Sequence, residues 1–125
     1  MQTSIKKVTN EHEEWKNTLA FYKDEIKFFR NRLDEVAAKN NKNEFLEKVE
    51  HFQNQIDIND EKISALKHDV DNYVHQVFTD TQEHANHVTN NTAEEFERLK
   101  GRVEVTGKIY QELKEDFKKF LEKVL

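Results

Sequence analysis

The chain contains no proline, no cysteine and only two glycines in 125 residues. Because proline is the strongest helix breaker, its absence permits long uninterrupted helices. Without cysteine there is no disulfide, no thiolate nucleophile and no cysteine-based metal site. The longest apolar run, Leu19 to Tyr22, is far shorter than the roughly 20 residues of a membrane-spanning helix. Met1 to Lys7 lack the apolar stretch of a secretory signal, so a cytoplasmic location is the default expectation and no membrane partner is predicted.

Neither sign of charge dominates the composition, which has 20 basic and 25 acidic residues and a net charge of -5. A nucleic-acid binder needs a basic face, so the composition argues against such a partner. Nucleophilic catalysis lacks its usual motifs too: there is no glycine-rich phosphate loop and no Gly-x-Ser-x-Gly, and Ser4 and Ser64 stand alone. The sequence therefore predicts no enzyme activity and no cofactor.

What the chain does have is an apolar residue at alternating steps of four and three, in three successive stretches. This spacing places the side chains along one face of a helix, and only His12, Asn59 and Thr106 interrupt the apolar pattern. The positions are 8, 12, 15, 19, 22, 26, 29, 33 and 36; 45, 49, 52, 56, 59, 63, 66, 70, 73 and 77; and 96, 99, 103, 106, 110, 113, 117, 120 and 124.

The pattern predicts an all-α fold, an antiparallel up-down-up bundle of three long helices with coiled-coil-like packing. We expect one domain over residues 1–125, with helices at about 4–39, 43–83 and 89–124. A buried polar residue at a pattern position often fixes register or oligomeric state at some cost in stability, which is our interpretation of the three interruptions.

Several residues resemble helix caps. The first helix is expected to begin near Ser4 or Asn10, and Asn43 is expected to cap the second. For the third helix, Thr92 and Glu95 have the spacing of a capping box. Within that helix, the segment from residue 101 to 107 (GRVEVTG) has the poorest helix propensity of the chain, and we interpret it as a tolerated weak spot or a slight bend.

Histidines offer the only chemical hypothesis. An up-down-up bundle brings most of them toward the half that holds the second turn, where carboxylates lie nearby. The alternative this suggests is a zinc, iron or manganese site formed by His12, Asp80, Glu83, His84 and His87. No histidine follows an acid by three positions, as the di-metal bundles require, so we favour surface or capping roles for the histidines and expect no metal.

Phe21 and Phe28 lie seven residues apart and off the apolar face of the first helix. Two phenylalanines on a face that should contact water suggest that another surface covers them. That surface is either the third helix, in a wide core, or a second chain. Ile58 and Val105 are off-pattern apolar residues of the same kind.

Five segments resemble a family of small, uncharacterised, all-helical bacterial proteins: HEEW (12–15), FYKDE (21–25), VEHFQNQ (49–55), LKHDV (66–70) and ELKEDFKKFL (112–121). The resemblance implies a helical fold but no activity, cofactor or partner, so it assigns no site residues. The sequence as a whole favours a non-enzymatic helical bundle that acts in protein–protein interaction or self-association. A metal-binding or metal-sensing bundle is the alternative.

Overall fold

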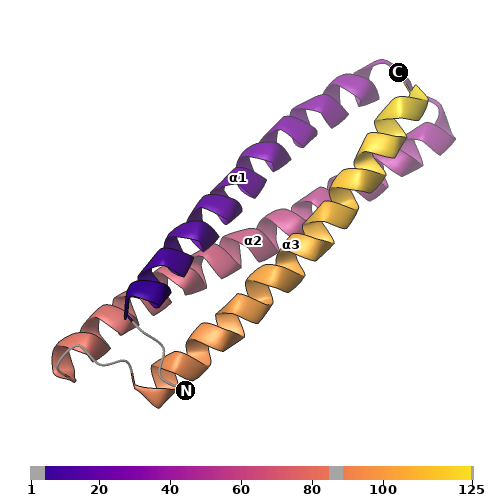
Figure 1. The fold of residues 1–125 in the computed structure, drawn as a ribbon. Coiled ribbons are helices and arrows are strands. Elements are labelled where there is room, and N and C mark those ends of the chain that lie inside the picture. The colour runs from indigo at the N-terminus through magenta and orange to yellow at the C-terminus, as the bar shows by residue number, and fades with distance from the viewer. Residues whose placement is uncertain (1–4, 85–88, 125) are drawn as a thin grey trace.

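In a computed structural model, which describes residues 5–84 and 89–124, the chain forms three helices: α1 (Ile5–Ala38), α2 (Asn43–Glu83) and α3 (Asn90–Val124). Figure 1 shows α1 and α3 running in one direction and α2 returning in the other. Strands are absent from the described residues, so the predicted all-α, up-down-up bundle is confirmed.

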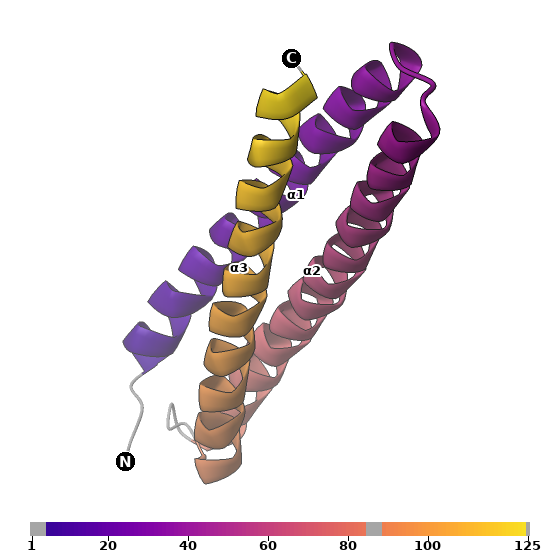
Figure 2. The same cartoon turned by 90° about the vertical axis from the view of Figure 1, so that its right-hand side faces the viewer.

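The core is built from the predicted apolar positions. Val8, Leu19, Ile56, Ile63, Val70 and Phe117 are among those with no exposed surface. Figure 1 shows the ribbons of α1 and α3 apart from one another, and Figure 2 shows α3 crossing in front of α1; large aromatic pairs pack between these two helices. Their ring centroids are 5.2 Å apart for Trp15 and Phe96, 4.4 Å for Tyr22 and Tyr110, and 5.2 Å for Phe29 and Phe117.

The three polar interruptions differ in depth. His12 is 4% exposed and Asn59 is 3% exposed, so both lie in the core. The Asn59 amide donates to the carbonyl of Gln55 in its own helix, at 2.9 Å. Thr106 is only partly buried.

The three helices begin within one residue of the predicted starts at about 4, 43 and 89, but the predicted capping residues need correction. Because α1 begins at Ile5, Asn10 lies inside the helix, and Ser4 lies outside the described residues. The prediction that Asn43 caps α2 was wrong, because Asn43 is the first residue of that helix. The cap position belongs to Lys42, whose side chain makes no capping bond. Asn40 accepts the backbone N–H of Lys42 instead, at 3.1 Å, and so shapes the turn before the helix.

The capping box predicted at Thr92 and Glu95 was wrong as well, because α3 begins at Asn90. The hydroxyl of Thr89 accepts the backbone N–H of Thr92 at 3.4 Å, so Thr89 caps α3 and Thr92 lies in its first turn.

Glycine at position 107 has a packing role. A β-carbon there would lie 3.0 Å from the hydroxyl oxygen of Tyr22, so glycine allows this ring to lie close to α3. A β-carbon on Gly101 would meet nothing within 4 Å. Helix α3 continues through both positions.

Candidate interaction surface

Phe21 and Phe28 remain exposed on α1, with 54% and 65% of their surfaces accessible. The third helix therefore does not cover them, which corrects the first of the two explanations given above. The Phe21 ring centroid lies 6.3 Å from that of Tyr22, which packs against the core, and the Phe28 centroid lies 6.2 Å from that of Phe29, a core residue. Helix α3 approaches Phe21 through Lys114, whose amine lies 5.9 Å from the centre of the Phe21 ring.

Acidic residues lie in line with the two phenylalanines along α1. Glu14, Phe21, Phe28 and Glu35 follow one another at intervals of seven and therefore form one row along α1. Asp24 lies between the two rings in the sequence and is exposed. Glu35 pairs with Arg32 at 3.1 Å. We call Glu14, Phe21, Asp24, Phe28 and Glu35 the α1 row.

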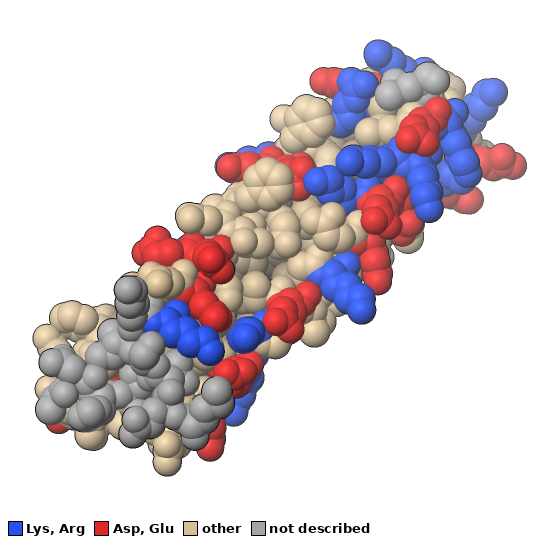
Figure 3. Space-filling view, viewed as in Figure 1, with Lys and Arg blue, Asp and Glu red and all other residues tan. Residues whose placement is uncertain are grey.

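A polar contact fixes the border between the α1 row and α3. Glu25 accepts the hydroxyl of Tyr110 at 2.8 Å and pairs with the Lys114 amine at 2.9 Å. Burial, with help from Glu25, raises the pKa of Tyr110, so its hydroxyl stays protonated and keeps donating to the carboxylate. Figure 3 shows uncharged residues along the middle of this face, between α1 and α3, with charged side chains on either side.

Other large apolar side chains are exposed elsewhere on the bundle. Ile58 (43%) and Val105 (58%) belong to this group, as do Leu46, Phe78 and Ile109. Single exposed apolar residues are common on protein surfaces and need no partner. The α1 row differs because its two aromatic rings follow one another on the same side of one helix.

At the other candidate site, near the second turn, Asp80 organises the backbone. Its Oδ2 atom accepts the backbone N–H of Thr89 and the hydroxyl of Thr92, both at 2.9 Å. The bond from the Thr89 backbone, with that from Thr92, lowers the pKa of Asp80. His84 contacts the same carboxylate through Nδ1, at 3.0 Å from Oδ1. These contacts assign Asp80 a structural role at the start of α3.

Of the proposed metal ligands that the structure describes, only Asp80 and His84 lie together. His12 lies in the core against aromatic rings, Glu83 is exposed, and Asp80 is engaged by Thr89 and Thr92. In the part of the chain that the structure describes, no group of three or more potential ligands is placed to hold a metal ion. The prediction for His87 lies outside the described residues.

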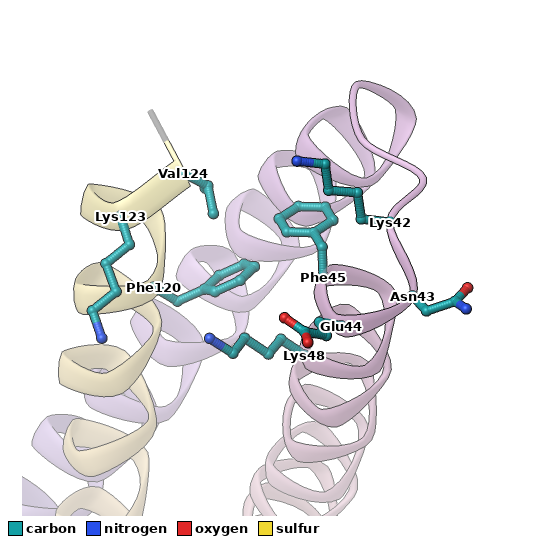
Figure 4. A pocket seen from close by; sticks show the side chains of 8 residues that line it. All are labelled: Lys42, Asn43, Glu44, Phe45, Lys48, Phe120, Lys123 and Val124. Carbon is teal, nitrogen blue, oxygen red and sulfur yellow. The ribbon is translucent and has the colours of Figure 1, made fainter.

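A pocket that the sequence did not reveal lies at the opposite end of the bundle, between the start of α2 and the end of α3. Its volume is about 320 Å³, and Figure 4 shows the side chains that line it. These are Lys42, Asn43, Glu44, Phe45, Lys48, Phe120, Lys123 and Val124. The sequence signal was the pair Lys42 and Lys48 just after the first turn, but nothing in the apolar pattern placed Lys123 beside them.

Comparison with known proteins finds no matching family model, no significant match among curated proteins and none among solved structures. The family resemblance described above therefore stays a prediction. Across the described residues, no helix is long and apolar enough to cross a lipid bilayer.

Proposed function

We propose that this protein is a non-enzymatic helical bundle that binds another protein through the α1 row. The observation that carries the proposal is the exposure of Phe21 and Phe28, at 54% and 65%, side by side in one row of a helix whose other large aromatic residues are mostly buried. Covering the remaining surface of each ring stabilises a complex by about 1 to 2 kcal/mol. Two such rings form a small anchor of the kind that dominates many interfaces.

Charge favours a basic partner over a second copy of the chain. If two α1 rows paired in parallel, Glu14 would face Glu14 of the other copy. If they paired antiparallel around the two rings, Glu14 would face Glu35. Either arrangement brings like charges together, which disfavours pairing. A partner helix with an apolar side flanked by lysine or arginine complements both the rings and the acids.

The test is capture of partners from the native host, with purified wild type and the variant Phe21→Ser/Phe28→Ser as bait. Phe78→Ser is the matched control, because Phe78 is 60% exposed but lies on α2. We expect a partner that wild type and Phe78→Ser retain, that the double variant loses, and that is released as salt is raised. The captured partner should then bind purified wild type at least about tenfold more tightly than the double variant.

Sedimentation equilibrium separates the two possible occupants. We expect a monomer mass for wild type and for the double variant at micromolar concentration. A dimer that disappears in the double variant would assign the surface to self-association. If the double variant retains both the mass and the partners of wild type, the α1 row is not an interaction surface.

A further inference from the structure

The pocket between the start of α2 and the end of α3 lies at a different place from the α1 row, and its lining combines aromatic rings with cationic groups. Its volume of about 320 Å³ falls at the lower end of the range for small-molecule sites. The floor is apolar: the rings of Phe45 and Phe120 stack with centroids 5.7 Å apart and an angle of 24° between their planes. Both residues are buried, so the floor belongs to the core and is firmly held.

The charged residues that line the pocket around this floor are three lysines, Lys42, Lys48 and Lys123, and one acid, Glu44. In Figure 4, the Lys48 amine reaches across toward α3 below Phe120, and the Lys42 side chain extends over the ring of Phe45. The amine of Lys123 points away along the outside of α3. Thus two cations border the space between the two helices, and Lys123 lines the pocket from α3 with its amine turned away.

None of the three lysine amines has an ion-pair partner among the residues that the structure describes. The start of α2 adds to the positive potential, because the side chain at its cap position, Lys42, makes no capping bond, and Glu44 is the acid of its first turn. This local excess of positive charge occurs in a chain whose net charge is -5. Figure 3 also shows lysine and arginine gathered toward the end of the bundle that carries the last part of α3.

From these features we infer that the end pocket binds a small amphiphilic anion, with an aromatic or short aliphatic body on the phenylalanine floor and a carboxylate or phosphate group paired with the amine of Lys42 or of Lys48. Lysine amines act as point charges and impose no planar geometry, so they accept either kind of anion. The volume limits the body to about one ring or a short chain. The site is independent of the α1 row, and each can fail without the other.

Titration of ¹⁵N-labelled protein with phenyl phosphate, followed by NMR, tests the inference. We expect shifts of the backbone signals of residues 42–48 and 120–124, with a Kd on the order of 1 mM or tighter. Phenylacetate should bind the same residues. Phenylacetamide, which lacks the charge, and inorganic phosphate, which lacks the ring, should each bind at least about tenfold more weakly, because each satisfies only half of the pocket.

The variant Lys42→Gln/Lys48→Gln should bind phenyl phosphate about tenfold more weakly or worse. Its matched control is Lys62→Gln/Lys67→Gln, which removes the same charge from α2 away from the pocket and should bind within about twofold of wild type. Lys42 and Lys48 are exposed, so the fold should persist in this variant, and circular dichroism is the measurement that checks it. Three results would each overturn the inference. They are binding of phenylacetamide as tight as that of phenyl phosphate, an equal loss of phenyl phosphate affinity in the two double variants, and no NMR shifts at a ligand concentration tenfold above the expected Kd.

Discussion

The ring of His12 packs edge to face against the ring of Tyr73, with centroids 4.9 Å apart and planes at 84°. Trp15 and Phe96 complete the surroundings, at 5.4 and 6.4 Å. The Nε2 atom of His12 is buried and has no hydrogen-bond partner among residues 5–84 and 89–124. Burial, reinforced by the nearby charge of Lys16, lowers the pKa of His12 from 6.5 to about 4, so the folded protein holds this imidazole neutral at pH 7.

A stability profile in urea at several pH values tests this assignment. The unfolded chain takes up a proton on His12 below pH 6.5, whereas the folded chain does so only near pH 4, so protonation favours unfolding between those values. We expect the contribution of His12 to the free energy of unfolding to be almost fully present above about pH 6.5. The free energy of unfolding should then decrease by about 2 kcal/mol between pH 7.5 and pH 5.

The variant His12→Phe should lose most of this dependence on pH, because it removes the titrating group. His51→Gln serves as the control, since His51 is exposed on α2, and it should keep the dependence. An unchanged profile in His12→Phe would show that another group causes the pH effect.

Asp80 determines where α3 begins, because it holds both Thr89 and Thr92. The variant Asp80→Asn weakens both bonds, so we expect a lower melting temperature and faster hydrogen exchange at the Thr89 amide. The pKa of Asp80 is lowered in the fold, so its stabilisation should be present above its ordinary pKa near 4 and be lost as the pH falls through the folded value. Glu83→Gln, an exposed change three residues away, should alter neither measurement.

The spacing of apolar residues was enough to predict the fold class and the burial of His12 and Asn59, because helical periodicity fixes which side of a helix faces its neighbours. It did not fix how deep each position lies. Thr106 is only partly buried, although it occupies a pattern position. The exposed fraction of a residue depends on the distance between helices and on the size of neighbouring side chains, and the apolar pattern of one helix determines neither.

The same limit applies to the sites. Whether α3 covers Phe21 and Phe28 depends on how α1 and α3 cross, and the pattern left both explanations open. The end pocket joins residues 42–48 to residues 120–124, which only the folded chain brings together. The cap of α3 was predicted wrongly for a local reason. Thr89 and Thr92 are both good capping residues, and the hydrogen bond that the Thr89 backbone N–H donates to Asp80 favours the earlier helix start.

The two glycines of α3 should respond differently to alanine. Replacing glycine inside a helix stabilises it by roughly 1 kcal/mol when the methyl group meets no obstacle. Gly101→Ala has free space and should gain about that amount in urea denaturation. Gly107→Ala should gain less or nothing, because its methyl group lies 3.0 Å from the hydroxyl oxygen of Tyr22.

Removing that hydroxyl provides the control. In the background Tyr22→Phe, Gly107→Ala should stabilise the protein about as much as Gly101→Ala does, since the closest atom is gone. Equal gains at both glycines in the wild-type background would mean that Tyr22 moves aside at no cost, and the packing role of Gly107 would be lost.

Asn59→Leu should stabilise the bundle. Asn59 is 3% exposed, and the hydrogen bond that its amide donates among the described residues stays within its own helix, so a leucine with the same number of side-chain heavy atoms exchanges a weakly satisfied polar group for apolar contact. Leucine also has a higher helix propensity than asparagine, by about 0.5 kcal/mol.

Asn54→Leu isolates that second contribution, because Asn54 is exposed on the same helix. We expect Asn59→Leu to gain about 1 kcal/mol more than Asn54→Leu in the free energy of unfolding. A clear loss would mean that Asn59 makes interactions across the core that exceed its desolvation cost, and it would remove the basis for interpreting this position as apolar.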